Sequence, residues 1–184
     1  MSSWSKVARD NRVLLGFVLA VVYLWRARPD WHSLLYGSVL MVCGLALRAA
    51  ASGHLRKNME VTTSGPYAYV RNPLYLGSAI LAAGFAVAAR DWWLAAAMLV
   101  FFLAVYLPVI LAEETWLRAN FPEFEEYARD VPRLWPRLWP RFRREGAGQG
   151  RFSRELYLQH REYNALLGAV AMLAALVVKL LRFS

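Results

Sequence analysis

Long hydrophobic runs, separated by shorter polar connections, dominate the pattern of this chain. The apolar residues are grouped into these runs and are not spread at the spacing of a strand or of an amphipathic helix. Such runs match the hydrocarbon core of a bilayer, where a backbone has to satisfy its own hydrogen bonds as a helix. We therefore predict an all-α, polytopic membrane bundle of about five transmembrane helices. The predicted spans are residues 13–25, 31–51, 74–89, 92–112 and 164–181.

The first and the last predicted spans carry basic residues at their ends. The run 13–25 lies between Arg12 and Arg26 and extends only about 20 Å, at about 1.5 Å per residue. Snorkelling of these arginines, or local thinning of the bilayer, is expected to cover the remaining thickness. Lys179 lies close enough to the end of the last run to be expected among lipid headgroups.

The distribution of Lys and Arg predicts the orientation. With a cytoplasmic N-terminus, 17 of the 22 basic residues lie on the cytoplasmic side and 5 on the other. This bias is the positive-inside pattern, and it predicts an integral protein of the cell (inner) membrane with its C-terminus on the opposite side. The whole chain, residues 1–184, is expected to form one domain. Its polar segments 52–73 and 113–163 would then share the cytoplasmic side, where an active site could be assembled.

Composition supports the membrane interpretation and limits the partners. The hydrophobic share of 58% and the mean hydropathy of +0.29 exceed those of an ordinary soluble domain. The net charge of +9 could indicate nucleic acid, but most of the basic residues lie beside predicted spans. We therefore expect membrane lipids with anionic headgroups as partners, and no nucleic acid.

The segment Val131–Arg144, VPRLWPRLWPRFRR, repeats Trp, Pro and Arg in a nearly regular order. Trp prefers the membrane interface, Arg binds phosphate groups, and Pro prevents a regular helix. Two interpretations stay open for this segment: a basic, partly extended interfacial anchor, or direct contact with a substrate.

Several kinds of chemistry have no support in the sequence. Cys43 is the only cysteine, which excludes an internal disulfide and Cys-x-x-Cys chemistry. The three histidines, His32, His54 and His160, are scattered along the chain, so no metal site is expected. The chain also lacks the motifs of P-loop NTPases, Gly-x-Ser-x-Gly hydrolases and dinucleotide-binding enzymes.

Two polar blocks flank the hairpin that the third and fourth spans are predicted to form. The first block, Thr62–Gly77, has the sequence TTSGPYAYVRNPLYLG, in which Asn72 and Pro73 have the form of a helix start. The second block is Leu111–Pro136, with the sequence LAEETWLRANFPEFEEYARDVPRLWP. Because both ends of the hairpin return to one membrane surface, the blocks are expected to enclose a half-polar, half-apolar pocket.

Glu113 and Glu114 are placed at the predicted cytoplasmic end of the fourth span. Adjacent carboxylates are unfavourable there, because a helix C-terminus already carries partial negative charge. A cation should compensate, and Arg71 is the nearest candidate. Alternatively, the two glutamates pair with Arg118 in solvent, and Arg71 is only a topology signal. Interface aromatics are an alternative role for Tyr67, Tyr69 and Tyr75.

The two blocks together resemble the isoprenylcysteine carboxyl methyltransferase and phospholipid methyltransferase superfamily. Its members carry a G-x-Y-x-x-x-R-H-P-x-Y-x-G stretch, a helical hairpin, a Glu-Glu pair and a closing F-x-x-x-Y-x-x-Y-x-x-x-V-P-type segment. The matching residues are Gly65, Tyr67, Arg71, Pro73, Tyr75, Gly77, Glu113, Glu114, Phe121, Tyr127, Val131 and Pro132.

This resemblance implies a methyltransferase that uses S-adenosyl-L-methionine and acts on a lipid or lipidated acceptor, such as an isoprenylcysteine carboxylate or a related amphiphile. It implies a cytoplasmic cofactor pocket, capped by the segment after the fourth span, and a tunnel between helices for the lipid. The implied cofactor-binding residues are Lys57, Met59, Glu60, Val61, Thr62, Tyr67, Asn72, Pro73, Leu74, Tyr75 and Glu113. The implied catalytic residues are Arg71, Asn72, Glu113 and Glu114.

The sequence departs from the family pattern at two positions. Asn72 replaces the family's histidine, keeping a hydrogen-bonding side chain that cannot transfer a proton. Val109 stands where prenylcysteine-specific members have an arginine for the substrate carboxylate, so an amine, thiol or other lipid acceptor stays open. Two other functions stay open as well: an NADPH-dependent membrane reductase of the sterol type, and a non-catalytic membrane subunit.

Overall fold

The computed structural model describes residues 16–57, 59–139 and 151–183. All regular secondary structure in these residues is helical, so the predicted class of helical membrane bundle is confirmed. In chain order the elements are the N-terminal helix Gly16–Arg26, α2 (Trp31–Ser52), the 3₁₀ helix η1 (Gly65–Ala68), α3 (Pro73–Ala89), α4 (Trp92–Asn120), α5 (Phe124–Asp130), α6 (Arg154–Gln159) and α7 (Tyr163–Phe183).

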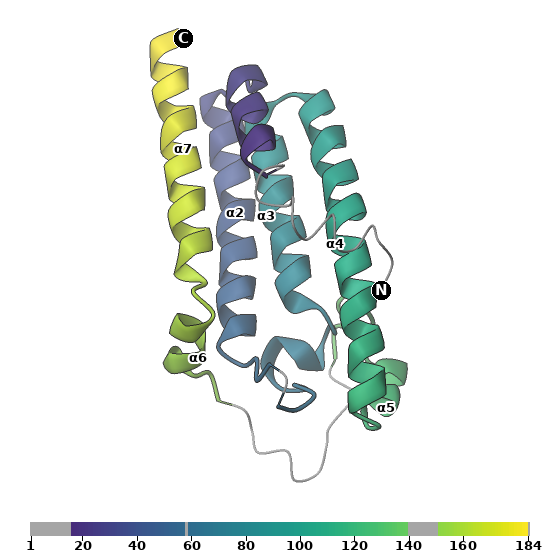
Figure 1. The fold of residues 1–184 in the computed structure, drawn as a ribbon. Helices are drawn as coiled ribbons and strands as arrows, with labels where there is room; N and C mark the ends of the chain where they lie inside the picture. Colours follow the sequence, from purple (N-terminus) through teal and green to yellow (C-terminus); the bar gives the residue numbers. More distant parts are fainter. Residues whose placement is uncertain (1–15, 58, 140–150, 184) are drawn as a thin grey trace.

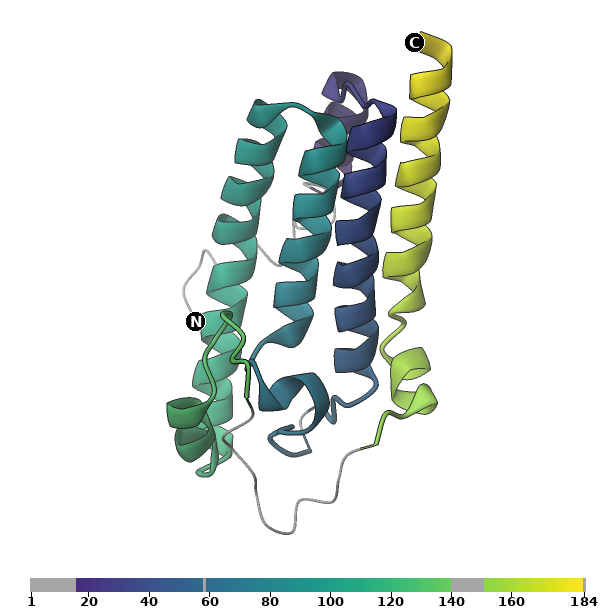
Figure 2. The same cartoon turned by 180° about the vertical axis from the view of Figure 1, so that it is seen from behind.

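The long helices stand side by side in the order α7, α2, α3 and α4 (Figures 1 and 2). α2 and α4 run in one direction, and α3 and α7 run in the other. As a result η1, α5 and α6 gather at one end of the bundle, and the N-terminal helix lies at the other. The described parts of the two polar segments, 52–73 and 113–163, therefore share one end of the molecule.

The lengths of the helices only partly match the predicted spans. α2, α4 and α7 are each long and apolar enough to cross a membrane. α3 has 17 residues and extends about 25 Å, at about 1.5 Å per residue. The described part of the N-terminal helix, Gly16–Arg26, is shorter and does not reach across a hydrocarbon core of about 30 Å. The first residues of the predicted span 13–25 lie outside the described residues.

Glycines bring α2 and α3 into close contact. Gly37 lies against Gly84, and Gly44 lies against Gly77. A Cβ on Gly84 would lie 2.7 Å from the carbonyl oxygen of Gly37, and a Cβ on Gly44 would lie 2.7 Å from that of Gly77. Small residues are the usual means of close helix packing in lipid. This packing fixes α3 on α2 and so positions the residues at the start of α3.

Charged side chains join the elements at the end of the bundle that carries the turn between α3 and α4. Arg26 pairs with Asp91 at 2.8 Å, and Arg90 pairs with Asp30. Both carboxylates also cap helices: Asp30 caps α2 and Asp91 caps α4. Backbone hydrogen bonds and the opposite charges lower the pKa of each of these carboxyl groups.

Lys179 has protein partners near the end of α7, and its expected reach to lipid headgroups stays a prediction. Its ammonium group donates to the carbonyl oxygens of Leu24 and Trp25, at 2.6 and 2.8 Å. These carbonyls belong to the last turn of the N-terminal helix, where the carbonyl oxygens receive no hydrogen bond from an N–H group of the same helix. A cation is favourable at this end of a helix, so the contact holds α7 against the N-terminal helix.

Arg48 joins three elements at the opposite end of the bundle. Its guanidinium binds both carboxylate oxygens of Glu162, at 2.8 to 3.0 Å, just before α7 begins. It also donates to the Ser78 hydroxyl and to the Leu74 carbonyl oxygen in α3. Gly77 leaves room for this side chain, because a Cβ there would lie 2.7 Å from Arg48 Cγ. The contact ties the start of α7 to α2 and α3.

Gly44→Ala is expected to lower the apparent melting temperature of the detergent-purified protein. The new Cβ would meet backbone atoms of Gly77 and Leu81 at 2.7 Å, and overpacking of this kind costs about 1–3 kcal/mol. Gly168→Ala is the matched control, because nothing lies within 4 Å of a Cβ at that position and alanine favours a helix. Equal melting temperatures for the two variants would contradict the close packing of α2 on α3.

Candidate active site

Three segments that are far apart in the sequence meet at the end of the bundle that holds η1 and α5. They are the connection from α2 to α3, the second half of α4, and the extended segment 131–139, which we call the strap. In Figure 2 the strap, drawn in green after α5, rises beside α4 towards the start of α3. Arg71 N donates to Pro132 O at 2.9 Å, and Arg137 N donates to Tyr69 O at 3.0 Å. The expected meeting of the two polar blocks is therefore present.

The 3₁₀ helix η1 places a buried tyrosine beside the acidic pair of α4. Gly65 begins η1 with a left-handed φ of 58°, and a Cβ there would lie 2.6 Å from the His54 ring. Tyr67 is buried, and its carbonyl oxygen accepts from the Tyr127 hydroxyl at 2.8 Å. Burial, followed by the electrostatic effects of Tyr127 and of the Glu113 carboxylate, raises the pKa of Tyr67. This tyrosine stays protonated and lies near Glu113.

Asn72, the residue just before α3, uses its side chain in the site and not as a helix cap. Pro73 occupies the first position of the helix, as predicted, because its ring already has a helical φ. Asn72 makes no side-chain capping bond. Its Nδ2 donates instead to Glu114 Oε1 at 3.0 Å and to Arg133 O at 3.2 Å. A neutral amide can make both bonds at once without carrying a titratable proton.

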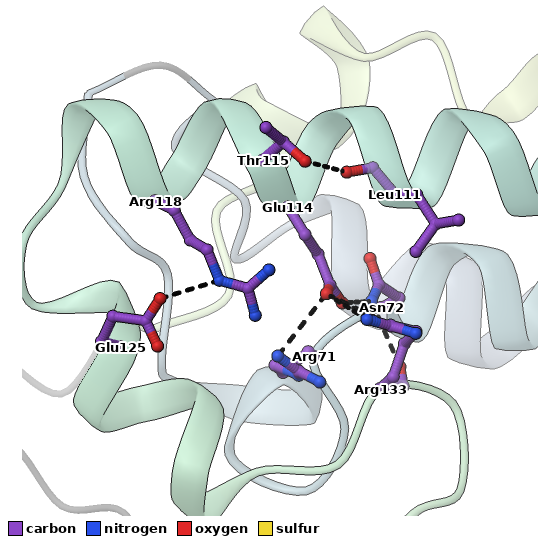
Figure 3. A network of polar contacts seen from close by, with 8 residues as sticks. All are labelled: Arg71, Asn72, Leu111, Glu114, Thr115, Arg118, Glu125 and Arg133. Carbon is purple, nitrogen blue, oxygen red and sulfur yellow. Dashed lines mark hydrogen bonds and ion pairs between the residues drawn. The ribbon is translucent and has the colours of Figure 1, made fainter.

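Glu114 is the centre of a buried network that also contains Arg71, Asn72 and Arg133 (Figure 3). We call these four residues the Glu114 network. The Glu114 residue is only 2% exposed. Arg133 donates through Nε and Nη2 to both carboxylate oxygens, at 2.9 to 3.1 Å. Arg71 approaches from another side, with Nη1 3.6 Å from Oε2. A buried carboxylate needs such cations and donors to remain charged.

The two arginines respond differently to this carboxylate. Its hydrogen bonds with Arg133 raise the pKa of that guanidinium. Burial lowers the pKa of Arg71, and the charge of Glu114 offsets only part of that effect. Arg71 is therefore the more buried and the less well compensated of the two cations.

The acidic pair occupies a different place on its helix from the predicted one. α4 continues to Asn120, so Glu113 and Glu114 lie inside the helix and not at its C-terminus. The negative end of the helix is therefore not the reason that they need partners; burial is. The alternative partner, Arg118, pairs with Glu125 at 2.8 Å instead (Figure 3).

Aromatic side chains connect Glu113 to an apolar cavity between α3 and α4. The Tyr75 hydroxyl donates to Glu113 Oε2 at 2.9 Å. The Tyr75 ring meets Tyr106 edge to face, with centroids 5.9 Å apart, and Tyr106 stacks on Phe102 at 5.0 Å. Phe102 lines a cavity of about 230 Å³, which we call the α3–α4 groove. The groove is lined by Ala79, Ala82, Ala83, Ala86, Ala95, Met98, Leu99 and Phe102.

Some of the side chains implied to bind the cofactor are exposed at the surface. Lys57, Met59 and Glu60 are all exposed, Met59 at 78%. Glu60 forms a 3.6 Å ion pair with Arg56 on the surface. If these residues contact a cofactor in this arrangement, their backbone atoms are the available groups. Their binding role stays a prediction.

Other implied residues shape the loop or face the site. Val61 is buried in a small core with Phe124, Tyr127 and Val131, and Thr62 Oγ1 accepts from Arg56 N at 3.1 Å. Buried Pro73 and Leu74 form the first turn of α3, next to Asn72. The structure thus brings together Tyr67, Arg71, Asn72, Tyr75, Glu113 and Glu114.

Three contributors were missed by the sequence analysis. Arg133 directly follows the Val-Pro pair of the second block, but its basic, Trp-rich surroundings favoured an interfacial role. Phe102 and Tyr106 are four residues apart, and Glu113 follows Tyr106 by seven, which places all three near one helix face. That spacing was the available signal for the aromatic connection.

Comparisons with known proteins place the chain in a family. Residues 35–123 match the phospholipid methyltransferase family. The chain is 33% identical over 133 residues to the nickel-cobalt-cadmium resistance protein NccN of Alcaligenes xylosoxydans xylosoxydans. It is 34% identical over 133 residues to the cobalt-zinc-cadmium resistance protein CzcN of Cupriavidus metallidurans.

Each alignment covers 67% of this chain, but it covers only 62% and 61% of the two relatives. The chain therefore spans about six tenths of the length of the curated relatives that it matches. No solved structure matches the chain significantly. The region matched by the family contains most of α2, all of α3 and the acidic pair of α4. Through this region the chain belongs to the phospholipid methyltransferase family, within the isoprenylcysteine and phospholipid methyltransferase superfamily of membrane methyltransferases.

Proposed function

We propose that this protein uses S-adenosyl-L-methionine to methylate a lipid-like acceptor at the cytoplasmic face of the cell's inner membrane. The observation that carries the proposal is the 2.9 Å contact between the Tyr75 hydroxyl and Glu113. This contact joins Glu113, the chain neighbour of the buried Glu114, to the aromatic side chains that lead into the α3–α4 groove. An amphiphile needs both environments, one for its head and one for its tail.

The chemical groups of the site fit the cofactor. Glu113 supplies a carboxylate that can accept from an amino group or from ribose hydroxyls. Arg71 Nε is buried and has no hydrogen-bond partner among the described residues, so a donor remains for an anionic group. The cofactor would supply an electrophilic methyl group, and its transfer requires alignment and exclusion of water more than proton transfer. The non-titrating Asn72 is compatible with such a reaction.

The dimensions of the groove favour an acceptor with a long apolar tail. Phe102 precedes Glu113 by eleven residues of α4, which is about 16 Å at about 1.5 Å per residue. The groove then continues to Ala95, about 27 Å from Glu113 on the same scale. Its α3 wall consists of alanines, which leave the space open. A prenyl or acyl chain fits this shape, with its head beside Glu113.

The strap would lie at the lipid interface, where the expected anionic headgroup partners are. Its Trp135, Leu138 and Trp139 side chains are 86%, 88% and 78% exposed. Glu113 follows Trp92 by 21 residues, or about 32 Å at about 1.5 Å per residue, which matches the thickness of a hydrocarbon core. The strap, bonded to this level of α4, would place its indoles at the membrane boundary, where Trp is favoured. Residues 140–144 of the predicted anchor lie outside the described residues.

The names of the two relatives associate them with metal resistance. In the described part of this chain, no group of three His, Cys, Asp or Glu side chains could hold a metal ion. We base the lipid-modifying role on the family match and propose that any link to metal resistance passes through the membrane.

Glu113→Ala is expected to abolish binding of S-adenosylhomocysteine, because it removes the carboxylate that Tyr75 orients. Isothermal titration of the detergent-purified protein measures this affinity. Glu155→Ala, at an exposed position of α6, is the matched control and should bind normally. Unchanged affinity of Glu113→Ala would refute the role of Glu113, and binding of NADPH instead of the nucleoside would support the reductase alternative.

Ala82→Phe is expected to reduce methyl transfer to long-chain acceptors at least tenfold, because the ring would fill the α3–α4 groove. Affinity for S-adenosylhomocysteine should not change, because the side chains of Tyr75, Tyr106 and Phe102 separate the groove from Glu113. Radiolabelled methyl transfer into a lipid extract measures the effect. Ala104→Phe, on an exposed face of α4, is the control. Equal turnover by the two variants would exclude the groove as the site of the tail.

The double variant Trp135→Phe, Trp139→Phe tests whether the indoles of the strap lie at the membrane boundary. The protein is placed in vesicles, and brominated phosphatidylcholine, which quenches indoles in the membrane, is added. We expect this lipid to quench the wild type more than the double variant, because it quenches the emission of Trp135 and Trp139. Aqueous iodide should quench this emission weakly, because indoles at the membrane boundary are shielded from solvent. The reverse pattern of quenching would show that the strap faces water.

A further inference from the structure

Arg71 is a buried cation with unused hydrogen-bonding capacity. Its side chain is 10% exposed, and its one ion pair among the described residues joins Nη1 to Glu114 Oε2 at 3.6 Å. That distance is longer than a normal charge-assisted hydrogen bond, which is about 2.7–2.9 Å. Its Nε is buried and has no partner among the described residues. A guanidinium has five N–H donors, so Arg71 is poorly satisfied for so buried a group.

Glu114 cannot satisfy Arg71 because other donors already occupy it. Arg133 binds both carboxylate oxygens at 2.9 to 3.1 Å, and Asn72 donates to Oε1 at 3.0 Å. An ionised carboxylate has about four lone-pair sites, and these bonds use most of them. The more exposed arginine, Arg133, therefore makes shorter contacts and more hydrogen bonds with the Glu114 carboxylate than Arg71 does. Its side chain is 37% exposed.

The charges of the Glu114 network are also unbalanced. Arg71 and Arg133 together bring two positive charges to one carboxylate. A third arginine, Arg137, bonds through its backbone to Tyr69, two residues before Arg71, and its Nη1 is likewise buried without a partner among the described residues. Buried charges are normally paired, because desolvation makes an unpaired one costly. The excess of positive charge lies in the segment that connects η1 to α3 and in the strap bonded to it.

We propose that Arg71 is the anchor of an oxyanion subsite, and that its ligand is a carboxylate or phosphate group of a molecule bound at this site. The inference rests on the proposed function, because that function supplies two molecules that can carry such a group. One is the cofactor, whose methionine part ends in a carboxylate. The other is the acceptor, whose head can be a carboxylate or a phosphate. Both present the same chemistry to the planar guanidinium.

The test compares paired probes that differ in the anionic group. The first pair is S-adenosylhomocysteine and its decarboxylated analogue, which keeps the amine. The second pair is dodecyl phosphate and dodecanol. Dissociation constants are measured by isothermal titration on the full chain in detergent, for the wild type, Arg71→Gln and Arg71→Lys. Arg118→Gln is the matched control, because Arg118 pairs on the surface with Glu125.

Arg71→Gln is expected to weaken the anionic member of one pair by about 10- to 100-fold, the effect of losing a hydrogen bond to a charged group. The member of that pair that lacks the anionic group should not bind more weakly, and Arg118→Gln should change neither. A loss confined to S-adenosylhomocysteine identifies the cofactor as the source of the oxyanion. A loss confined to dodecyl phosphate identifies the acceptor.

Equal effects of Arg71→Gln on both members of each pair, or no effect on any probe, would overturn the proposal. Arg71→Lys keeps the charge but loses the planar fork, so it should reduce the preference for the anionic probe. If Arg71→Gln does not fold, a Lys variant with the wild-type preference would overturn the proposal. If the wild type binds neither nucleoside, the proposed function fails, while the phosphate pair still tests the oxyanion subsite.

Discussion

The burial of Glu114 is the constraint on which the arrangement of the site depends. Removing a carboxylate from water costs several kcal/mol unless cations and hydrogen-bond donors surround it. α4 supplies none of the donors found here. Asn72 lies 42 residues earlier in the chain, and Arg133 lies 19 residues later. The connection from α2 and the strap therefore have to reach α4, and their meeting encloses the site.

The second feature of the site is that it joins two environments, one polar and one apolar. The polar end lies among charged side chains, whereas the α3–α4 groove is lined by apolar residues alone. Tyr75 belongs to both, since its hydroxyl binds Glu113 while its ring contacts Tyr106. The glycines that hold α3 on α2 keep this junction in place, because they determine where α3 begins relative to its neighbours. Packing within the bundle and chemistry at its end are thus linked through α3.

Local sequence patterns predicted the helical bundle, the start of α3 at Pro73 and the compensation of the acidic pair by Arg71. They did not predict that α4 continues to Asn120, because polar residues beyond the membrane carry no apolar signal for a helix. They also left Arg133 in a segment with two interpretations, an interfacial anchor or a substrate contact, and neither pairs it with Glu114. An arginine beside Trp and Pro has the same local pattern whether it faces lipid or a carboxylate. The carbonyl partners of Lys179 could not be predicted either, since they lie more than 150 residues earlier.

The sequence by itself determined which segments are apolar enough to form the helices of the bundle, which superfamily the two polar blocks resemble, and which residue types are available for chemistry. These properties follow from composition and short spacing, which do not change with the fold. Only the tertiary structure decided that Arg133 takes the larger share of Glu114, that Arg71 is left with unused donors, and that aromatic rings join the site to a groove. Competition among donors for one buried carboxylate depends on distances between segments that are not adjacent in the chain. Such distances exist only after the helices have packed.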